Sequence, residues 1–284
     1  MSQQFLSGMA FAMTLFLVAA GLTLIFGLMD VLNLAHGTFY LVGAYVGLTV
    51  LKTSGNFWLA LIVAPLAVAG LGYLVETLVI RPVYARGHLD QVLLTLGLAY
   101  ILADQARGIW GSAEEALSAP VLLIGSVTVA GLFFPLYRLF VIGFGLAAAL
   151  ALWFLVERTR WGAIIRAGVT DPTMVRNLGI DIGRIFAHTF AFGCGLAALA
   201  GVVAGPIIGV APGLDAEILM LALIVVVTGG LGSLSGSFWG SILIGQADTF
   251  GKVLLPQFSL FFIFVVMALV LLYRPGGLLG KRAL

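Results

Sequence analysis

Residues 21–47 read GLTLIFGLMDVLNLAHGTFYLVGAYVG, an apolar segment with a polar centre. Gly27 and Gly37 stand at the edges of this centre. A polar group in hydrocarbon must find a partner, and irregular backbone is tolerated there only beside protein or a water-filled cavity. Two interpretations are open: a helix that breaks near residues 27–38 and lines a pathway, or a short cytoplasmic turn between two ordinary helices. The polar residues of the centre are Asp30, Asn33, His36 and Thr38.

The composition indicates a membrane protein. Hydrophobic residues make up 62% of the 284, charged residues only 9%, and the mean hydropathy is +1.17. Soluble domains contain about 25% charged residues, so this chain could not cover a soluble surface. A spanning helix needs about 20 apolar residues. We therefore expect an all-α polytopic membrane protein with about eight transmembrane helices, in which residues 1–284 form a single transmembrane domain.

Several classes of site find no support in the sequence. The net charge of +2 gives no reason to expect nucleic-acid binding. Cys194 is the only cysteine, which excludes an intramolecular disulfide, and three scattered histidines do not have the spacing of a metal site. The phosphate-loop pattern G-x-x-x-x-G-K-S/T is missing, so we expect no ATP site and no cofactor in this chain. The opening MSQQ has no basic residue, which argues against a cleaved signal peptide.

The arginines predict the orientation. They concentrate in residues 81–86, 158–184 and 274–282. Because cytoplasmic loops carry an excess of Lys and Arg, all three segments are expected inside. The N-terminus is then outside and the C-terminus cytoplasmic. Residues 111–135, which contain Glu114, Glu115 and Pro120, are expected to form an external connection with an interfacial segment.

A second interrupted stretch, TGGLGSLSGSFWG, covers residues 228–240. The apolar run 218–229 before it is too short to span comfortably, so we expect a broken or re-entrant segment near residues 216–237. The motif SGSFW at 235–239 is similar to HGTFY at 36–40, and each follows a glycine-marked break. Paired interruptions in two halves of a chain point to a transport pathway, although so short a match can arise by chance.

The polar groups at the two breaks are the candidates for a translocation pathway. For each of them the alternative is a hydrogen bond that only stabilises a helix end. Carboxylates within apolar runs are also functional candidates, but Asp104 lies three residues before Arg107 and Asp248 four before Lys252, so structural ion pairs are expected. The predicted pathway residues are Asn33, His36, Gly37, Thr38, Thr228, Ser233 and Ser235.

Residues 157–185 are the most charged part of the chain and are predicted to form a cytoplasmic loop. Asp171 can cap a helix that begins at Pro172, and Gly179 is a natural stop. The helix would be about 10 Å long. It would either lie on the inner leaflet, with its arginines at lipid headgroups, or press into a groove on a soluble partner. Its apolar side carries Met174, Val175 and Leu178, and its charged side Arg176.

Four motifs, in this order, resemble the permease subunits of ABC importers for branched-chain amino acids. The similarity covers nearly the whole chain, and the order of the motifs makes it specific. The N-terminal motif consists of Gly21–Gly27, Asn33, Ala35-His36-Gly37, Phe39 and Gly43-Ala44-Tyr45. The others are Arg166-Ala167 with Asp171 and Leu178-Gly179-Ile180, then Gly229-Gly230-Leu231-Gly232-Ser233 with Gly236, and last Arg274-Pro275-Gly277-Leu278.

The resemblance implies a transport subunit rather than an enzyme, located in the bacterial inner membrane. It implies four kinds of partner: a second permease subunit, homologous or identical, two cytoplasmic ATPases that bind ATP and Mg, a periplasmic binding protein, and membrane lipid. The short helix after Asp171 would be the coupling helix that docks on an ATPase. The coupling residues would be Arg166, Asp171, Pro172, Met174, Arg176, Leu178 and Gly179.

Departures from the family pattern leave the substrate open. Leu34 stands where the family often has Phe, Thr38 where some relatives carry Glu, and Val175 where Ala is common. Related permeases carry urea, short-chain amides or aromatic carboxylates. A different class, the ion-coupled secondary transporter, would use buried carboxylates and would not need a capped helix in an arginine-rich loop. An intramembrane enzyme has little support, because Ser235 is not in a G-x-S-x-G motif, and no channel-type selectivity sequence is visible.

Overall fold

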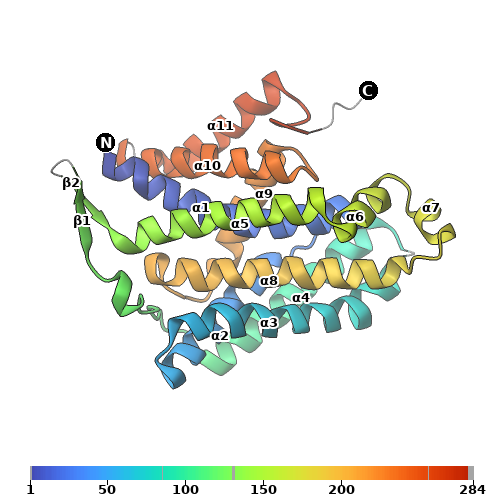
Figure 1. The fold of residues 1–284 in the computed structure, drawn as a ribbon, viewed down its shortest axis with the longest axis horizontal. Helices are drawn as coiled ribbons and strands as arrows, with labels where there is room; N and C mark the ends of the chain where they lie inside the picture. Colours follow the sequence, from blue (N-terminus) through green and yellow to red (C-terminus); the bar gives the residue numbers. More distant parts are fainter. Residues whose placement is uncertain (1, 85, 130–131, 255, 281–284) are drawn as a thin grey trace.

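The computed structural model describes residues 2–84, 86–129, 132–254 and 256–280, and most of them are helical (Figure 1). The α-helices are α1 (Ser2–Met29), α2 (His36–Ser54), α3 (Phe57–Val75), α4 (His88–Trp110), α5 (Leu136–Arg158), α6 (Arg160–Thr170), α7 (Pro172–Asn177), α8 (Ile182–Ile208), α9 (Leu214–Gly229), α10 (Leu234–Leu254) and α11 (Ser259–Tyr273). Shorter elements are the π-helical turn η1 (Glu76–Ile80), the 3-10 turns η2 (Arg81–Val83), η3 (Val121–Leu123) and η4 (Pro256–Phe258), and the strands β1 (Ser126–Val129) and β2 (Leu132–Pro135).

The length and composition of the helices are those of a membrane bundle. Six of the described helices are long and apolar enough to cross a membrane: α1, α3 continued through η1 and η2, α4, α5, α8, and α11 with η4. The bent pair of α9 and α10 could form one further, broken span. Helix α2 has 19 residues, so it is about 28 Å long, which is close to the thickness of the hydrocarbon core. The chain is therefore an all-α polytopic membrane protein, with roughly the number of spans expected.

Helices α1 and α8 form the centre of the bundle. In its most apolar window α1 is 83% buried, whereas α11 is only 6% buried and presents its apolar side chains outward. Glycine lets helices approach closely at this centre: a Cβ atom added at Gly201 of α8 would lie 2.3 Å from the Tyr40 carbonyl oxygen of α2. Small residues at helix contacts are the usual means of packing in lipid, where hydrocarbon competes with apolar side chains.

The two ends of the bundle differ in charge. Helices α6 and α7 and the last described residues lie at one end, and the N-terminus and the β1–β2 hairpin lie at the other (Figure 1). At the first of these ends Arg81 Nη2 donates to the Gly183 carbonyl over 2.9 Å. The arginine-rich segments thus share one end, which the positive-inside rule makes cytoplasmic. We call it the inner end and the opposite one the outer end; Lys281 and Arg282 lie outside the described residues.

The connection 111–135 has more structure than an interfacial segment. Strands β1 and β2 pair antiparallel, with Ser126 opposite Pro135. Upstream of them, Glu115 and Val210 exchange two backbone hydrogen bonds of 2.9 and 2.8 Å, and the Glu115 carboxylate pairs with Lys52 of α2. The connection is therefore fixed to the outer ends of α2 and α8. The alternating β-branched residues of SVTV favour the strand.

Candidate functional site

The first break is re-entrant. Helix α1 ends at Met29, and residues 30–35 return into the bundle as a non-helical segment, with a turn at residues 34–35, before α2 begins. The His36 ring Nε2 hydrogen-bonds to the Val18 carbonyl of α1 over 3.0 Å. Val18 lies eleven residues before Met29, so His36 sits roughly 16 Å above the inner end of α1. The break expected near residues 27–38 is confirmed, and it is more than a surface turn.

A threonine of α4 provides hydrogen bonds to this non-helical segment. The Thr95 hydroxyl accepts from the Leu34 N–H over 3.2 Å and lies within donating distance, also 3.2 Å, of the Leu32 carbonyl. The Asn33 side-chain oxygen accepts from the Ala35 N–H over 3.1 Å. Backbone groups away from water must be paired in this way. Sequence reasoning missed Thr95, whose only signal was a hydroxyl within an apolar run.

Helices α2 and α9 both begin inside the bundle, and their first turns meet. A Cβ atom added at Gly37 would lie only 2.1 Å from the Asp215 carbonyl oxygen, so the contact requires glycine. The Thr38 hydroxyl donates to Asp215 Oδ2 over 3.2 Å. The positive ends of two helix dipoles therefore face one region, and Asp215 supplies a negative charge there. Discontinuous helices of this kind form solute and ion sites in many transporters.

The second break is a sharp turn at residues 230–233, where α9 and α10 are bent by 118°. The Ser233 hydroxyl accepts from the Gly236 N–H over 3.0 Å at the start of α10. One turn further on, the hydroxyl oxygens of Thr23 and Ser237 are 2.5 Å apart, which ties α10 to α1. The broken segment expected near residues 216–237 is confirmed.

The structure does not gather the seven predicted pathway residues into one chamber. Ser233 and Ser235 lie at the inner end, and Ser235 is exposed. Gly37 and Thr38 lie at the contact with α9 instead. Three buried side-chain atoms of the seven residues have no hydrogen-bond partner in the described part of the chain, namely Asn33 Nδ2, His36 Nδ1 and Thr228 Oγ1. A role for the seven in translocation stays a prediction.

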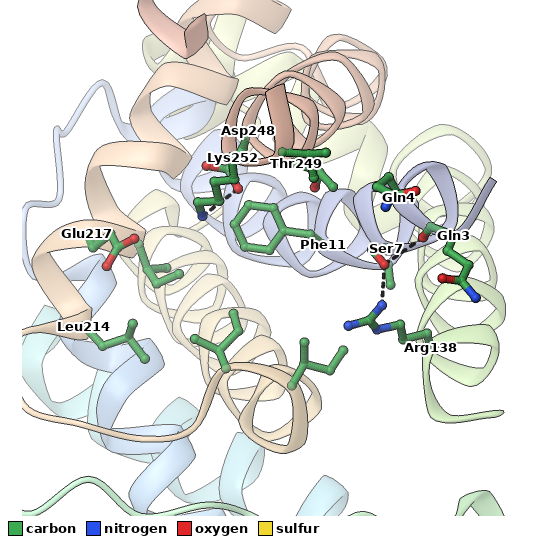
Figure 2. Close-up of a pocket in the computed structure, with 15 residues that line it drawn as sticks. Gln3, Gln4, Ser7, Phe11, Arg138, Leu214, Glu217, Asp248, Thr249 and Lys252 are labelled. Carbon is green, nitrogen blue, oxygen red and sulfur yellow. Dashed lines mark hydrogen bonds and ion pairs between the residues drawn. The ribbon is translucent and has the colours of Figure 1, made fainter. Parts of the chain in front are cut away.

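A cavity of about 420 Å³ opens at the outer end (Figure 2), and we call it the outer cavity. Its wall comes from the N-terminal turns of α1, the end of α8, the start of α9, the end of α10 and Arg138 of α5. The expected pair of Asp248 and Lys252 is confirmed here, with Lys252 Nζ 2.8 Å from Asp248 Oδ2. The second expected pair is wrong: Asp104 and Arg107 are exposed on α4 and form no ion pair among the described residues.

The short helix predicted after Asp171 is present as α7, and its role in coupling stays a prediction. The Asp171 Oδ1 accepts from the Met174 N–H over 2.9 Å, Pro172 is the first helical residue, and Gly179 has a positive φ of 81°. Val175 packs inward, whereas Leu178 is 70% exposed and Met174 and Arg176 are exposed too. Two of the three apolar side chains of this helix, Met174 and Leu178, are thus exposed in this chain. Arg166 lies on α6, an additional helix, and pairs with Glu157 at 3.5 Å.

A buried glutamate near the inner end was not foreseen. The side chain of Glu76 is fully buried, and its Oε2 lies 2.9 Å from Arg81 Nη2. The Tyr84 hydroxyl donates to Glu76 Oε1 over 2.8 Å, and burial with this carboxylate raises the pKa of Tyr84, so it remains a donor. Since Arg81 also binds the Gly183 carbonyl, the cluster joins the end of α3 to the start of α8. The signal for this cluster in the sequence was a single Glu within an apolar run.

The fold defines a polytopic all-α membrane protein with two broken segments. A family model described as the branched-chain amino acid transport system permease component matches residues 4–271. The chain therefore belongs to this family. The motif-based resemblance is confirmed over nearly the full length.

Known relatives agree with this assignment. The permease protein BraD of the high-affinity branched-chain amino acid transport system of Pseudomonas aeruginosa is 30% identical, over 98% of this chain and 95% of BraD. The corresponding LivH of Escherichia coli is 29% identical, with the same coverage. The fructose import permease FrcC of Rhizobium meliloti is 28% identical over 61% of this chain and half of its own length.

One solved structure has a similar fold. The complex PsaBC from Streptococcus pneumoniae with a Fab fragment matches with a TM-score of 0.50 over 94% of this chain and 89% of the other. The sequence identity is 15%, so the similarity concerns the fold alone.

Proposed function

We propose that this chain is a membrane-spanning permease subunit of an ATP-driven ABC importer. In this proposal a periplasmic binding protein delivers branched-chain amino acids or related small amphipathic solutes, and the permease carries them across the inner membrane. The full-length similarity to BraD and LivH, which are named as branched-chain amino acid permeases, supports it. The chain itself is a transport subunit, and separate ATPases would bind ATP and Mg.

The observation that carries the proposal is the geometry of α7. A helix of only six residues is not stable by itself, so its cap at Asp171 and its connection to α8 must hold it in place. It presents Met174 and Leu178, two flexible apolar side chains, beside Arg176 at the inner end. Exposed apolar groups with a neighbouring charge fit a groove on a soluble ATPase.

The Glu76 cluster provides a route from α7 into the bundle. Residues 178–181 connect α7 to α8, and Arg81 binds the Gly183 carbonyl in the first turn of α8. A movement of α7 would therefore displace the inner ends of α3 and α8 together. Such rigid displacement of packed helices is the ordinary basis of alternating access.

Two alternatives rank lower. Permeases for urea, amides or aromatic carboxylates would share the fold, and the partial similarity to FrcC extends the range of solutes to a sugar. An ion-coupled secondary transporter would need a carboxylate that can change its protonation. Among the described residues, the buried carboxylates Glu76 and Asp248 are each already engaged in an ion pair, with Arg81 and with Lys252.

The test is purification of the tagged chain in mild detergent, followed by mass identification of each co-purifying protein and by uptake in proteoliposomes. We expect an ATPase with a phosphate-loop motif in stoichiometric amount, and leucine uptake that requires ATP. Replacement of Leu178 by Asp should abolish both. Leu122→Asp, at an equally exposed leucine near the outer end, is the matched control and should abolish neither. A chain that purifies alone and transports without ATP would contradict the proposal.

A further inference from the structure

The outer cavity contains an even balance of charge. Two cations, Arg138 and Lys252, and two anions, Glu217 and Asp248, line it. Figure 2 shows Glu217 on α9 and Lys252 on α10 at one side, and Arg138 near Ser7 at the other. The four come from three helices, so the balance arises from the fold and not from one charged segment.

These charged groups differ in how far the chain already satisfies them. Lys252 is bound to Asp248, but its side chain is 54% exposed and an ammonium group has three donors. Arg138 donates to the Ser7 hydroxyl and has further N–H groups. Glu217 is exposed toward the cavity and forms no hydrogen bond or ion pair with any described residue. The cavity thus offers one free anionic acceptor beside cationic donors.

The remaining wall combines apolar and polar side chains. Its apolar residues include Phe11, Ile207, Leu214 and Ile218, and the Phe11 ring lies 5.5 Å from Lys252 Nζ. Its uncharged polar residues are Gln3, Gln4, Ser7 and Thr249. A volume of about 420 Å³ is in the range of small-molecule sites, which combine apolar walls with a few polar groups. An aliphatic side chain would therefore find contacts next to the charged groups.

We propose that the outer cavity binds a zwitterionic α-amino acid with an aliphatic side chain. Glu217 receives the ammonium group, Lys252 receives the carboxylate, and the aliphatic group packs against Phe11, Leu214 and Ile218. Arg138 adds positive charge on the opposite wall and draws the carboxylate in from the outer end. The inference rests on the proposed function, for which it names the site and the class of solute.

Other solutes leave a charged group without a partner. An aromatic carboxylate would leave Glu217 unpaired, and an amine would leave Lys252 without its additional acceptor. Urea or a sugar would satisfy neither charge by an ion pair. Enclosing an unpaired charge is costly, so the lining selects a solute that carries both signs.

The experiment measures binding of radiolabelled leucine to the purified permease–ATPase complex in nanodiscs, without the binding protein. Two competitors each lack one charge: 4-methylpentanoate has no ammonium group and 3-methylbutylamine has no carboxylate. Leucine should bind better than either. Glu217→Gln should weaken leucine binding about tenfold or more, and it should reduce the preference for leucine over 4-methylpentanoate by a similar factor.

Three further variants complete the design. Glu217→Asp should keep the preference for leucine over 4-methylpentanoate. The double variant Asp248→Asn with Lys252→Met removes both charges of this ion pair, so neither charge is left unpaired. It should reduce the preference for leucine over 3-methylbutylamine. Asp104→Asn, at an exposed carboxylate outside the cavity, should change nothing.

The outcomes separate the two proposals. If the wild-type complex performs ATP-driven leucine uptake but Glu217→Gln binds leucine and 4-methylpentanoate as the wild type does, the site is overturned and the function stands. Wild-type complex that does not bind leucine at millimolar concentration also overturns the site. ATP-driven uptake of another solute, with no uptake of leucine, overturns the proposed substrate class and the site together. If Glu217→Gln fails to assemble, the double variant provides the test. An unchanged preference of that variant for leucine over 3-methylbutylamine would overturn the site.

Discussion

The two breaks in the bundle are held by different chemistry. Residues 30–35 are non-helical and use side chains: a hydroxyl from Thr95 and an amide from Asn33. Residues 230–233 are held mainly by backbone contacts, because the chain after α11 packs directly against them. The Leu278 N–H donates to the Thr228 carbonyl over 2.9 Å, and a Cβ atom at Gly230 would lie 2.5 Å from the Gly280 nitrogen.

The difference shows which changes each break can tolerate. A break supported by a side chain loses its hydrogen bond when that side chain changes, while its shape can persist. A break formed by close backbone contact has no room for any added side chain, so even a methyl group must displace a neighbouring segment. The second break should therefore be the more sensitive to substitution.

The largest effect is expected for Gly230→Ala. The residue has φ of +109°, and the new methyl group would overlap residues 276–280. Strain and overpacking together should cost at least about 3 kcal/mol, enough to lower the melting temperature and the monodisperse fraction in detergent strongly. Gly55→Ala is the matched control: φ is also positive but the space around it is open, so about 1 kcal/mol is expected. Equal losses in both variants would refute close packing as the cause.

A smaller effect is expected for Thr95→Val. Loss of the hydroxyl leaves the Leu34 N–H without its partner while the shape is kept, at a cost of about 1–3 kcal/mol. Hydrogen exchange of residues 30–35, followed by mass spectrometry, should accelerate while residues 230–233 stay unchanged. Thr95→Ser should restore protection. Thr77→Val, which affects only hydrogen bonds within its own helix, should leave residues 30–35 as they are.

The smallest effect is expected at the contact of α1 with α10, the helix that follows the second break. The Thr23 and Ser237 hydroxyls bind each other, so Thr23→Val should cost about 1 kcal/mol. Once Ser237 is already Ala, the same change should cost little more, since the shared bond is gone. A double-mutant cycle on the melting temperature measures this coupling. Additive costs would mean that the two hydroxyls are independent.

Local signals predicted the membrane class, both breaks and the capped helix α7. Composition, glycine pairs and the Asp171-Pro172 sequence act over a few residues, so one sequence is enough to identify them. The predicted ion pair of Asp104 with Arg107 is wrong. Helical spacing allows such a contact but does not enforce it, and both side chains are exposed on α4, where no burial favours it.

The contacts that build the site join distant parts of the chain. Thr95 reaches across 61 residues to Leu34, and Thr38 across 177 to Asp215. No local pattern predicts such partners. Glu76 was the exception: its isolated charge in an apolar run could have been noticed, although the bond from its partner Arg81 to the distant Gly183 carbonyl could not.

The dependence of the first break on Thr95 and Asp215 bears on membrane insertion. Synthesis proceeds from the N-terminus, so α1 and α2 enter the bilayer before α4 supplies Thr95 and well before α9 supplies Asp215. Until then the Leu34 N–H lacks its Thr95 partner, and hydrocarbon penalises an unpaired backbone group at that depth. The first two helices should therefore insert as a plain hairpin with these residues at the cytoplasmic surface. They move inward only when the later helices arrive, so the re-entrant segment is a late product of assembly.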